Sequence, residues 1–212
     1  MNKKRTLIFS LCLSILLSFV FVPVPAFAAS NSKISKKKVV VTYKKVTRGI
    51  LVICNNKNKA TISIKETVKF LDSDKQTLSS ETQKNLCLKG KNTATFFFAT
   101  PRDSDGNTIN YTSFTGRYSI GKSKYTSRKS DIKINSELDV TEGRFVAVNT
   151  GKTTLSSIYA TFVFYDASGS ILGCYTKYIN CFKPKDIDQF SIGYIDEFSH
   201  PDKVKVYINW AY

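Results

Sequence analysis

The sequence has little of the chemistry from which catalytic and metal sites are built. Its 212 residues include one histidine, His200, in the turn-like segment Ser199-His200-Pro201-Asp202. A Ser/His/Asp or Cys/His arrangement needs a nucleophile and a base oriented by a third group, and no nucleophile motif is present. No C-x-x-C pair occurs, so the cysteine spacing does not indicate zinc. We therefore expect no enzyme, no catalytic residue, no metal site and no cofactor.

Aspartates recur where turns are expected. Asp72 and Asp166 each follow a strand pattern, and an aspartate at a strand end is typical of a turn cap. The segment Asp103-x-Asp105-Gly106-Asn107 has ligands that suit calcium. An EF-hand loop, however, needs Gly at its sixth position and Glu at its twelfth, and neither fits. An Asp-Gly turn is the favoured interpretation.

An amphipathic helical pattern is also missing, and short alternating segments take its place. Many short strands at regular spacing are typical of sandwiches or barrels. The sequence predicts an all-β fold with strands at Val39–Tyr43, Ile50–Cys54, Thr61–Leu71, Thr77–Gln83, Thr93–Ala99, within Tyr111–Ile120, and at Ile132–Asn135, Arg144–Asn149, Ser156–Tyr165, Ile171–Tyr178, Ile187–Gly193 and Lys203–Trp210.

An internal repeat of 94 positions aligns residues 46–98 with 140–192 without a gap. About 16 of 53 positions are identical, which indicates one β-unit present twice. The matched pairs include Asn55 with Asn149 and Asp72 with Asp166. Such positions serve turns and a core, so the repeat predicts structure and not chemistry.

Strand parity predicts which side chains form the two cores. Ile158, Ala160, Phe162 and Phe164 share one face of their strand, and the corresponding face in the first copy carries Ile62, Ile64, Val68 and Phe70, interrupted by Glu66. Ser63, Lys65, Thr67 and Lys69 are then expected to face away from the core. Alternation with a period of two indicates a half-buried strand, and a slip of one residue would expose the whole apolar set.

The motif Phe162-x-Phe164-Tyr165-Asp166 resembles the signature of the FxLYD family, whose members are small β-sandwich domains of secreted and envelope proteins. A Val-x-Val-Asn strand end, residues 146–149, precedes the motif. The resemblance covers residues 46–100 and 140–212. It implies two tandem immunoglobulin-like β-sandwich domains and no catalytic residues.

Residues 1–28 have the pattern of a secretory signal peptide. Lys3, Lys4 and Arg5 precede an apolar run from Leu7 to Val22, and the A-x-A pattern Ala26-Phe27-Ala28 follows. The run of about 16 residues is shorter than the roughly 20 that a membrane span needs. We expect cleavage, no transmembrane span in the mature chain, and a secreted, extracellular protein that associates non-covalently with the wall. An uncleaved anchor is the alternative.

The domain organisation follows from the repeat and from composition. Residues 39–123 are expected to form the first sandwich and residues 130–212 the second. The Ser- and Lys-rich segment 124–129 is expected to link them.

The chain is strongly basic, with a net charge of +16. A positive exterior keeps a protein soluble and can also attract a polyanion. We expect the binding patch at the start of the first domain, formed by Lys36, Lys37, Lys38, Lys44, Lys45 and Arg48. An anionic wall polymer, a glycan or a surface protein is the expected partner. Specific nucleic-acid recognition is not expected, because no binding motif accompanies the charge.

Four cysteines remain after residue 28, and an exported chain can form disulfides. Four cysteines allow three connectivities. The pairing Cys54–Cys87 with Cys174–Cys181 is preferred because each bridge then stays within one domain. Buried free thiols are the alternative.

Tyr159 and Tyr165 are expected to face away from the Phe162 and Phe164 side of their strand. They form a candidate binding platform for a glycan or a protein. The alternative is that they pack against the first domain or the linker.

These observations favour a non-catalytic secreted binding protein that associates with the cell envelope or an anionic extracellular polymer. A secreted inhibitor, or a structural module that binds a protein partner, is the alternative.

Overall fold

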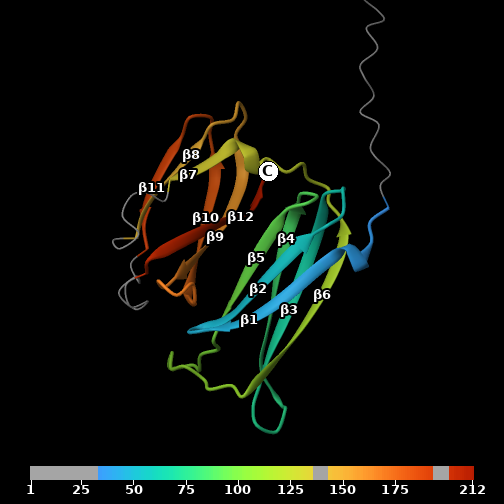
Figure 1. Ribbon diagram of the computed structural model, residues 1–212, viewed down its shortest axis with the longest axis vertical. Coiled ribbons are helices and arrows are strands. Elements are labelled where there is room, and N and C mark those ends of the chain that lie inside the picture. Colours follow the sequence, from blue (N-terminus) through green and yellow to red (C-terminus); the bar gives the residue numbers. More distant parts are fainter. Residues whose placement is uncertain (1–32, 136–142, 193–200) are drawn as a thin grey trace, which may run out of the picture. The chain divides into compact units, whose positions relative to one another are not determined.

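The computed structural model describes residues 33–135, 143–192 and 201–212. The predicted signal peptide and His200 lie outside the described residues. The described part contains twelve β-strands and two short 3₁₀ helices (Figure 1). In chain order the elements are η1 (Lys36–Lys38), β1 (Val39–Val46), β2 (Gly49–Asn56), β3 (Ile62–Leu71), β4 (Thr77–Leu88), β5 (Thr93–Ala99), β6 (Ser113–Lys122), η2 (Lys129–Asp131), β7 (Ile132–Asn135), β8 (Arg144–Asn149), β9 (Leu155–Tyr165), β10 (Ile171–Phe182), β11 (Ile187–Ser191) and β12 (Lys203–Ala211).

The predicted all-β fold and all twelve predicted strands are confirmed. The largest boundary differences are at β4 and β10, which extend to Leu88 and Phe182, past the predicted ends. In β4 the pairing with β3 shifts between Ile62 and Ile64, so the strand continues through an irregularity that a strict alternation does not anticipate. No helix among the described residues is long and apolar enough to cross a membrane.

The strands form four antiparallel sheets of three strands each, and the two halves of the chain repeat one strand order. We call residues 33–129 the first half and residues 130–212 the second half. The first half has the sheets β1-β2-β5 and β4-β3-β6, and the second has β7-β8-β11 and β10-β9-β12. Each sheet of one half thus has a counterpart in the other, strand by strand. The sequence repeat therefore corresponds to a repeated topology.

The cores lie between the paired sheets, as strand parity predicted. In the first half, β2, β3 and β5 supply most of the core, and Phe70, Phe96 and Phe98 are fully buried or nearly so. In the second half, Phe145, Phe162 and Phe164 are the corresponding large side chains. Burying each such ring stabilises the fold by roughly 1.5–3 kcal/mol. The arrangement is sandwich-like in both halves.

The structural repeat differs from the gapless alignment by one residue in its first part. Asn149 donates from Nδ2 to the carbonyls of Thr153 and Phe182, at 3.0 and 2.9 Å. Asn56 makes the same bonds to Ala60 and Leu88, at 3.0 and 3.2 Å. The partner of Asn149 is therefore Asn56 and not Asn55. The offset between the copies is 93 at this pair of asparagines and 94 from Ile64 and Ile158 onward. The second copy therefore has one extra residue before Ile158, at the place where the neighbouring residues Ser157 and Ile158 are both buried.

The two halves are in direct contact, and Ser32–Tyr212 forms one compact unit. Asn209, at a bulge of β12, accepts a 2.7 Å bond from the backbone N–H of Thr95 and donates to Oγ1 of Thr161 at 2.8 Å. Asn85 donates to the carbonyl of Asn209 at 2.6 Å. All four side chains are buried. Asn209 therefore satisfies the backbone N–H of Thr95 on β5, which is an outer strand of the sheet β1-β2-β5.

The predicted linker is also held in place. The N–H of Arg128 donates to the carbonyl of Ala211 at 2.8 Å, and the ring of Tyr125 stacks on Tyr212 with centroids 4.3 Å apart. The division into two independent domains, with boundaries at residues 123 and 130, stays a prediction.

Candidate anion-binding surface

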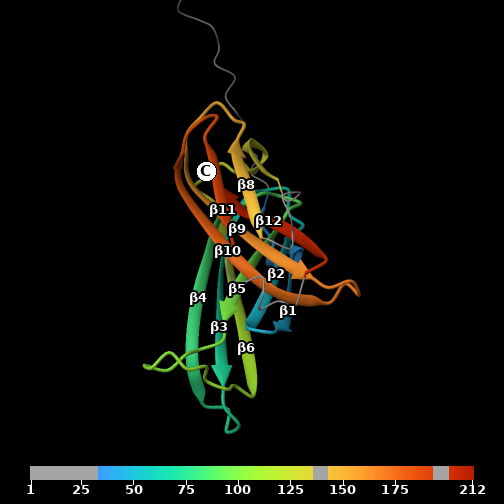
Figure 2. The same cartoon turned by 90° about the vertical axis from the view of Figure 1, so that its left-hand side faces the viewer.

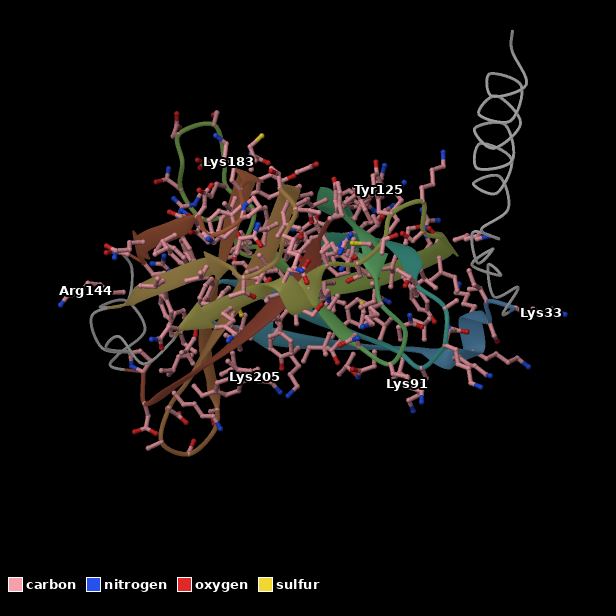
Figure 3. The ribbon with its side chains drawn as sticks, turned by 90° about the horizontal axis from the view of Figure 1, so that it is seen from above. Lys33, Lys91, Tyr125, Arg144, Lys183 and Lys205 are labelled. Atoms are coloured by element: carbon pink, nitrogen blue, oxygen red, sulfur yellow. The ribbon has the colours of Figure 1, made fainter. Side chains whose placement is uncertain are left out.

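The net positive charge of residues 33–212 lies in the first half. Residues 33–129 contain 21 Lys and Arg and six Asp and Glu, a net charge of +15. Residues 130–212 contain eight basic and ten acidic residues, a net charge of −2. In Figure 3, Lys33 of the first half and Arg144 of the second project at opposite ends of the view. Any attraction to a polyanion is therefore expected to act on the first half.

The six basic residues predicted as one patch are divided between the two ends of β1. Lys36, Lys37 and Lys38 form η1 before the strand, whereas Lys44 and Lys45 lie at its far end. An extended chain rises about 3.4 Å per residue, so Lys38 and Lys45 are roughly 24 Å apart. That separation exceeds the Debye length of about 8 Å at physiological salt. The two groups act as separate charges because the strand between them is extended.

Two lysines at the ends of β1 lie over aromatic rings. Lys36 Nζ is 4.7 Å from the ring centroid of Tyr118, and Lys45 Nζ is 4.8 Å from that of Tyr111. A cation over a ring face is attracted to it electrostatically. These contacts give both lysines a role in the fold in addition to any role in binding.

Arg48 follows β1 in the turn to β2 and lines a pocket of about 400 Å³. The first half also contributes Arg102 and Phe97 to the pocket lining, and the second half contributes Cys174 and Tyr175. Arg102 donates from Nη1 to the carbonyl of Gly106 at 2.9 Å. The pocket is therefore a basic recess where the two halves meet.

Tyr165 and Tyr159 are each partly buried against other side chains. Tyr165 packs on a buried cluster that joins Val46 and Leu51 of the first half to Val163 and Cys174 of the second. Desolvation raises the pKa of Tyr165 to about 12. The use of Tyr165 in a binding platform stays a prediction.

Tyr159 stacks on the only tryptophan, Trp210, with centroids 4.6 Å apart. Tyr178, 51% exposed, lies beside both rings. Ser157 connects this group, because it donates to Tyr178 at 2.8 Å and accepts from Nε1 of Trp210 at 3.0 Å. The exposed aromatic side chain in this group is thus Tyr178.

The structure contradicts both predicted disulfides, since all four described cysteines are free. Cys174 and Cys181 lie seven residues apart on β10, roughly 23 Å at about 3.3 Å per residue. A disulfide requires Cα atoms within about 7 Å. Cys54 is in the core of the first half, whereas Cys87 Sγ lies 3.8 Å from the carbonyl of Ala211. Sequence spacing did not reveal the face on which each thiol lies.

Burial makes three of these thiols weak acids. Desolvation raises the pKa of Cys174 to about 12, and it also raises the pKa of Cys54 and Cys87. Lys129, which donates to the carbonyl of Thr93 at 3.5 Å, has its pKa lowered by burial to about 8. Since the thiolate is the reactive form, Cys54, Cys87 and Cys174 are expected to be inert.

The expected turn aspartates are confirmed as caps. Asp72 Oδ1 accepts from the N–H groups of Asp74 and Gln76, and Asp166 Oδ1 accepts from the N–H of Ser170 at 2.8 Å. Asp103 accepts in the same way from the N–H groups of Asp105 and Asn107. Within residues 33–135, 143–192 and 201–212, no group of His, Cys, Asp and Glu is arranged to hold a metal ion.

No family model matches the chain, and no curated protein is significantly similar to it. The resemblance to the FxLYD family therefore stays a prediction.

Proposed function

We propose that this protein is a non-catalytic secreted binding protein that associates with the cell envelope or with an anionic extracellular polymer. The charge division carries the proposal: residues 33–129 have a net charge of +15, and the net charge of −2 in residues 130–212 offsets little of it. A strongly single-signed region attracts an opposite polymer over a distance and raises its local concentration.

The proposal includes the fold family and the location. The repeated topology and the sandwich-like cores are compatible with two immunoglobulin-like domains of FxLYD type. The apolar run and the A-x-A pattern of residues 1–28 support export through a cleaved signal. Export would bring the basic half into contact with the polymers of the cell surface.

Cosedimentation with purified cell walls tests the proposal. The protein is expected to bind at low salt and to elute between about 0.1 and 0.5 M salt, where the Debye length falls below about 10 Å. Absence of binding at low salt would remove the proposal. If this protein instead bound one partner protein tightly at high salt, that result would support the alternative of a secreted inhibitor.

A further inference from the structure

The outer face of the sheet β4-β3-β6 carries a regular array of cations and hydroxyl groups. β3 lies between β4 and β6 (Figure 2), and its outward residues pair across both neighbours. Three rows result, each written in the order β4, β3, β6: Lys84–Lys65–Ser119, Thr82–Thr67–Arg117 and Ser80–Lys69–Thr115. Every row thus has at least one cation and at least one hydroxyl group.

These outward side chains are accessible. Lys65, Lys69, Lys84 and Arg117 are all exposed. The two hydroxyls of the middle row, on Thr67 and Thr82, lie 2.9 Å apart at the surface. The part of the chain that the structure describes gives these four cations no ion pair. The face is therefore open and has uncompensated charge.

The array contains a repulsive contact that an anion would relieve. Lys65 and Lys84 are directly opposite each other on neighbouring antiparallel strands. Side chains in this position have Cβ atoms about 5 Å apart, and like charges there destabilise the sheet. An anionic oxygen between the two ammonium groups turns this repulsion into two attractive contacts.

The outward positions in the three rows include no acidic and no aromatic residue. The only carboxylate in this stretch of β3, Glu66, points inward and is fully buried. Binding of single-stranded nucleic acid depends on aromatic rings that stack on bases, and the rows supply none. The array suits a chain whose binding groups are anionic oxygens and whose linking units are hydroxylated.

We propose that the outer face of β4-β3-β6 binds a linear polyol-phosphate polymer, with phosphate groups seated on successive rows. Successive rows are about 6.8 Å apart, two residues at about 3.4 Å each. Lys65 with Lys84, then Arg117, then Lys69 supply the cations in order along the strands. This inference rests on the proposed function and assigns the surface and the ligand class.

The test uses the full mature protein and poly(glycerol phosphate) as the probe. One variant carries Lys65→Gln, Lys69→Gln, Lys84→Gln and Arg117→Gln. The matched control carries Lys57→Gln, Lys59→Gln, Lys89→Gln and Lys91→Gln, which removes the same charge from exposed loop positions of the same half. A third variant removes Lys36, Lys37, Lys38 and Lys44 in the same way. Circular dichroism and the urea midpoint verify that each variant is folded.

The dissociation constant is measured as a function of salt. For a flexible single chain, each cation that contacts a phosphate contributes about 0.7 to the slope of log K against log salt. The face variant is expected to lose about 3 in slope and most of its affinity, and the control variant far less. Equal losses in the face and control variants would overturn the inference, as would a larger loss in the third variant.

The two proposals fail in different ways. If the unmodified protein does not bind any anionic polymer, the proposed function fails. If it binds but the face variant behaves as the control does, only the assigned surface fails. Tighter binding of single-stranded DNA or of hyaluronate than of poly(glycerol phosphate) would overturn the assigned ligand class.

Discussion

The hydroxyl of Tyr43 donates a 2.6 Å hydrogen bond to Oε1 of Glu66, while Oε2 of Glu66 has no hydrogen-bond partner among the residues that the structure describes. Glu66 is fully buried and faces the core of the first half, where parity placed an interruption in the apolar face of β3. A Cβ on Gly116 would lie 2.1 Å from the Tyr43 ring, so the absence of a side chain there leaves room for this pair. Burial of one acid beneath the basic face also lowers the amount of surface negative charge.

The Glu66 carboxyl gives the first prediction. Desolvation, opposed by the bond from Tyr43, raises its pKa above the ordinary value of 4.5. The folded state therefore holds its proton at pH values where the unfolded state has lost it. The stability associated with this group is fully present below about pH 4.5 and is lost as pH rises through the folded-state pKa. Tyr43, Cys54 and Tyr118 are the titratable groups that face this site.

Urea unfolding of the wild type and of Glu66→Gln across pH 4 to 8 tests this prediction. Glu66→Gln removes the titration and retains an acceptor for Tyr43. The unfolding free energy of the variant should rise relative to that of the wild type as pH increases. A difference that does not change with pH would contradict a raised pKa.

The repeat gives a second prediction. Asn56→Ala and Asn149→Ala should each lower the unfolding free energy by about 1–3 kcal/mol, because each leaves buried carbonyl groups without a donor. Asn55→Ala is the matched comparison and should cost less, since the one side-chain hydrogen bond of Asn55 among the described residues is the bond that it accepts from Thr93 Oγ1. If Asn55→Ala were the more damaging change, the partner of Asn149 would be Asn55, as in the gapless alignment, and the pairing of Asn149 with Asn56 would be wrong. Urea midpoints at an unchanged m-value measure the three effects.

Contact between the halves gives a third prediction. Asn209→Ala leaves the N–H of Thr95 and the hydroxyl of Thr161 without their partner in a buried site. Each unpaired buried group costs roughly 1–3 kcal/mol. The exposed residue Asn180 on β10 provides the control, and Asn180→Ala should stay within about 0.5 kcal/mol of the wild type. Near-identical unfolding midpoints of the two variants would show that Asn209 does not stabilise the contact.

The thiols give a fourth prediction. In a chain that starts at Ala29, one cysteine should react rapidly with a thiol reagent under native conditions, and four should react after unfolding. Cys181 is exposed, whereas the other three are buried. Cys181→Ser should abolish the rapid phase. If no cysteine of a non-reduced sample were labelled rapidly, and rapid labelling appeared after reduction, a disulfide would be present. That result would contradict the free-thiol state.

The sequence alone determined the strands, the turns and the two cores. Alternation with a period of two shows which side chains share a face, and an aspartate at a strand end can cap the turn from within five residues. Both signals are local, so Phe162, Phe164 and Asp166 could be assigned without knowing any strand partner. The same local parity placed Lys65 and Lys69 on the outer side of β3.

Only the tertiary structure decided which faces meet. Parity assigns a side chain to one of two sides, but it does not say what lies on that side. Strand pairing brings Lys84 and Arg117 beside the two outward lysines of β3. Packing of the halves partly buries Tyr165, and a bulge in β12 brings Asn209 to Thr95 on β5. The extended path of β1 likewise separates basic residues that are close in the sequence, because each residue of a strand adds about 3.4 Å of length.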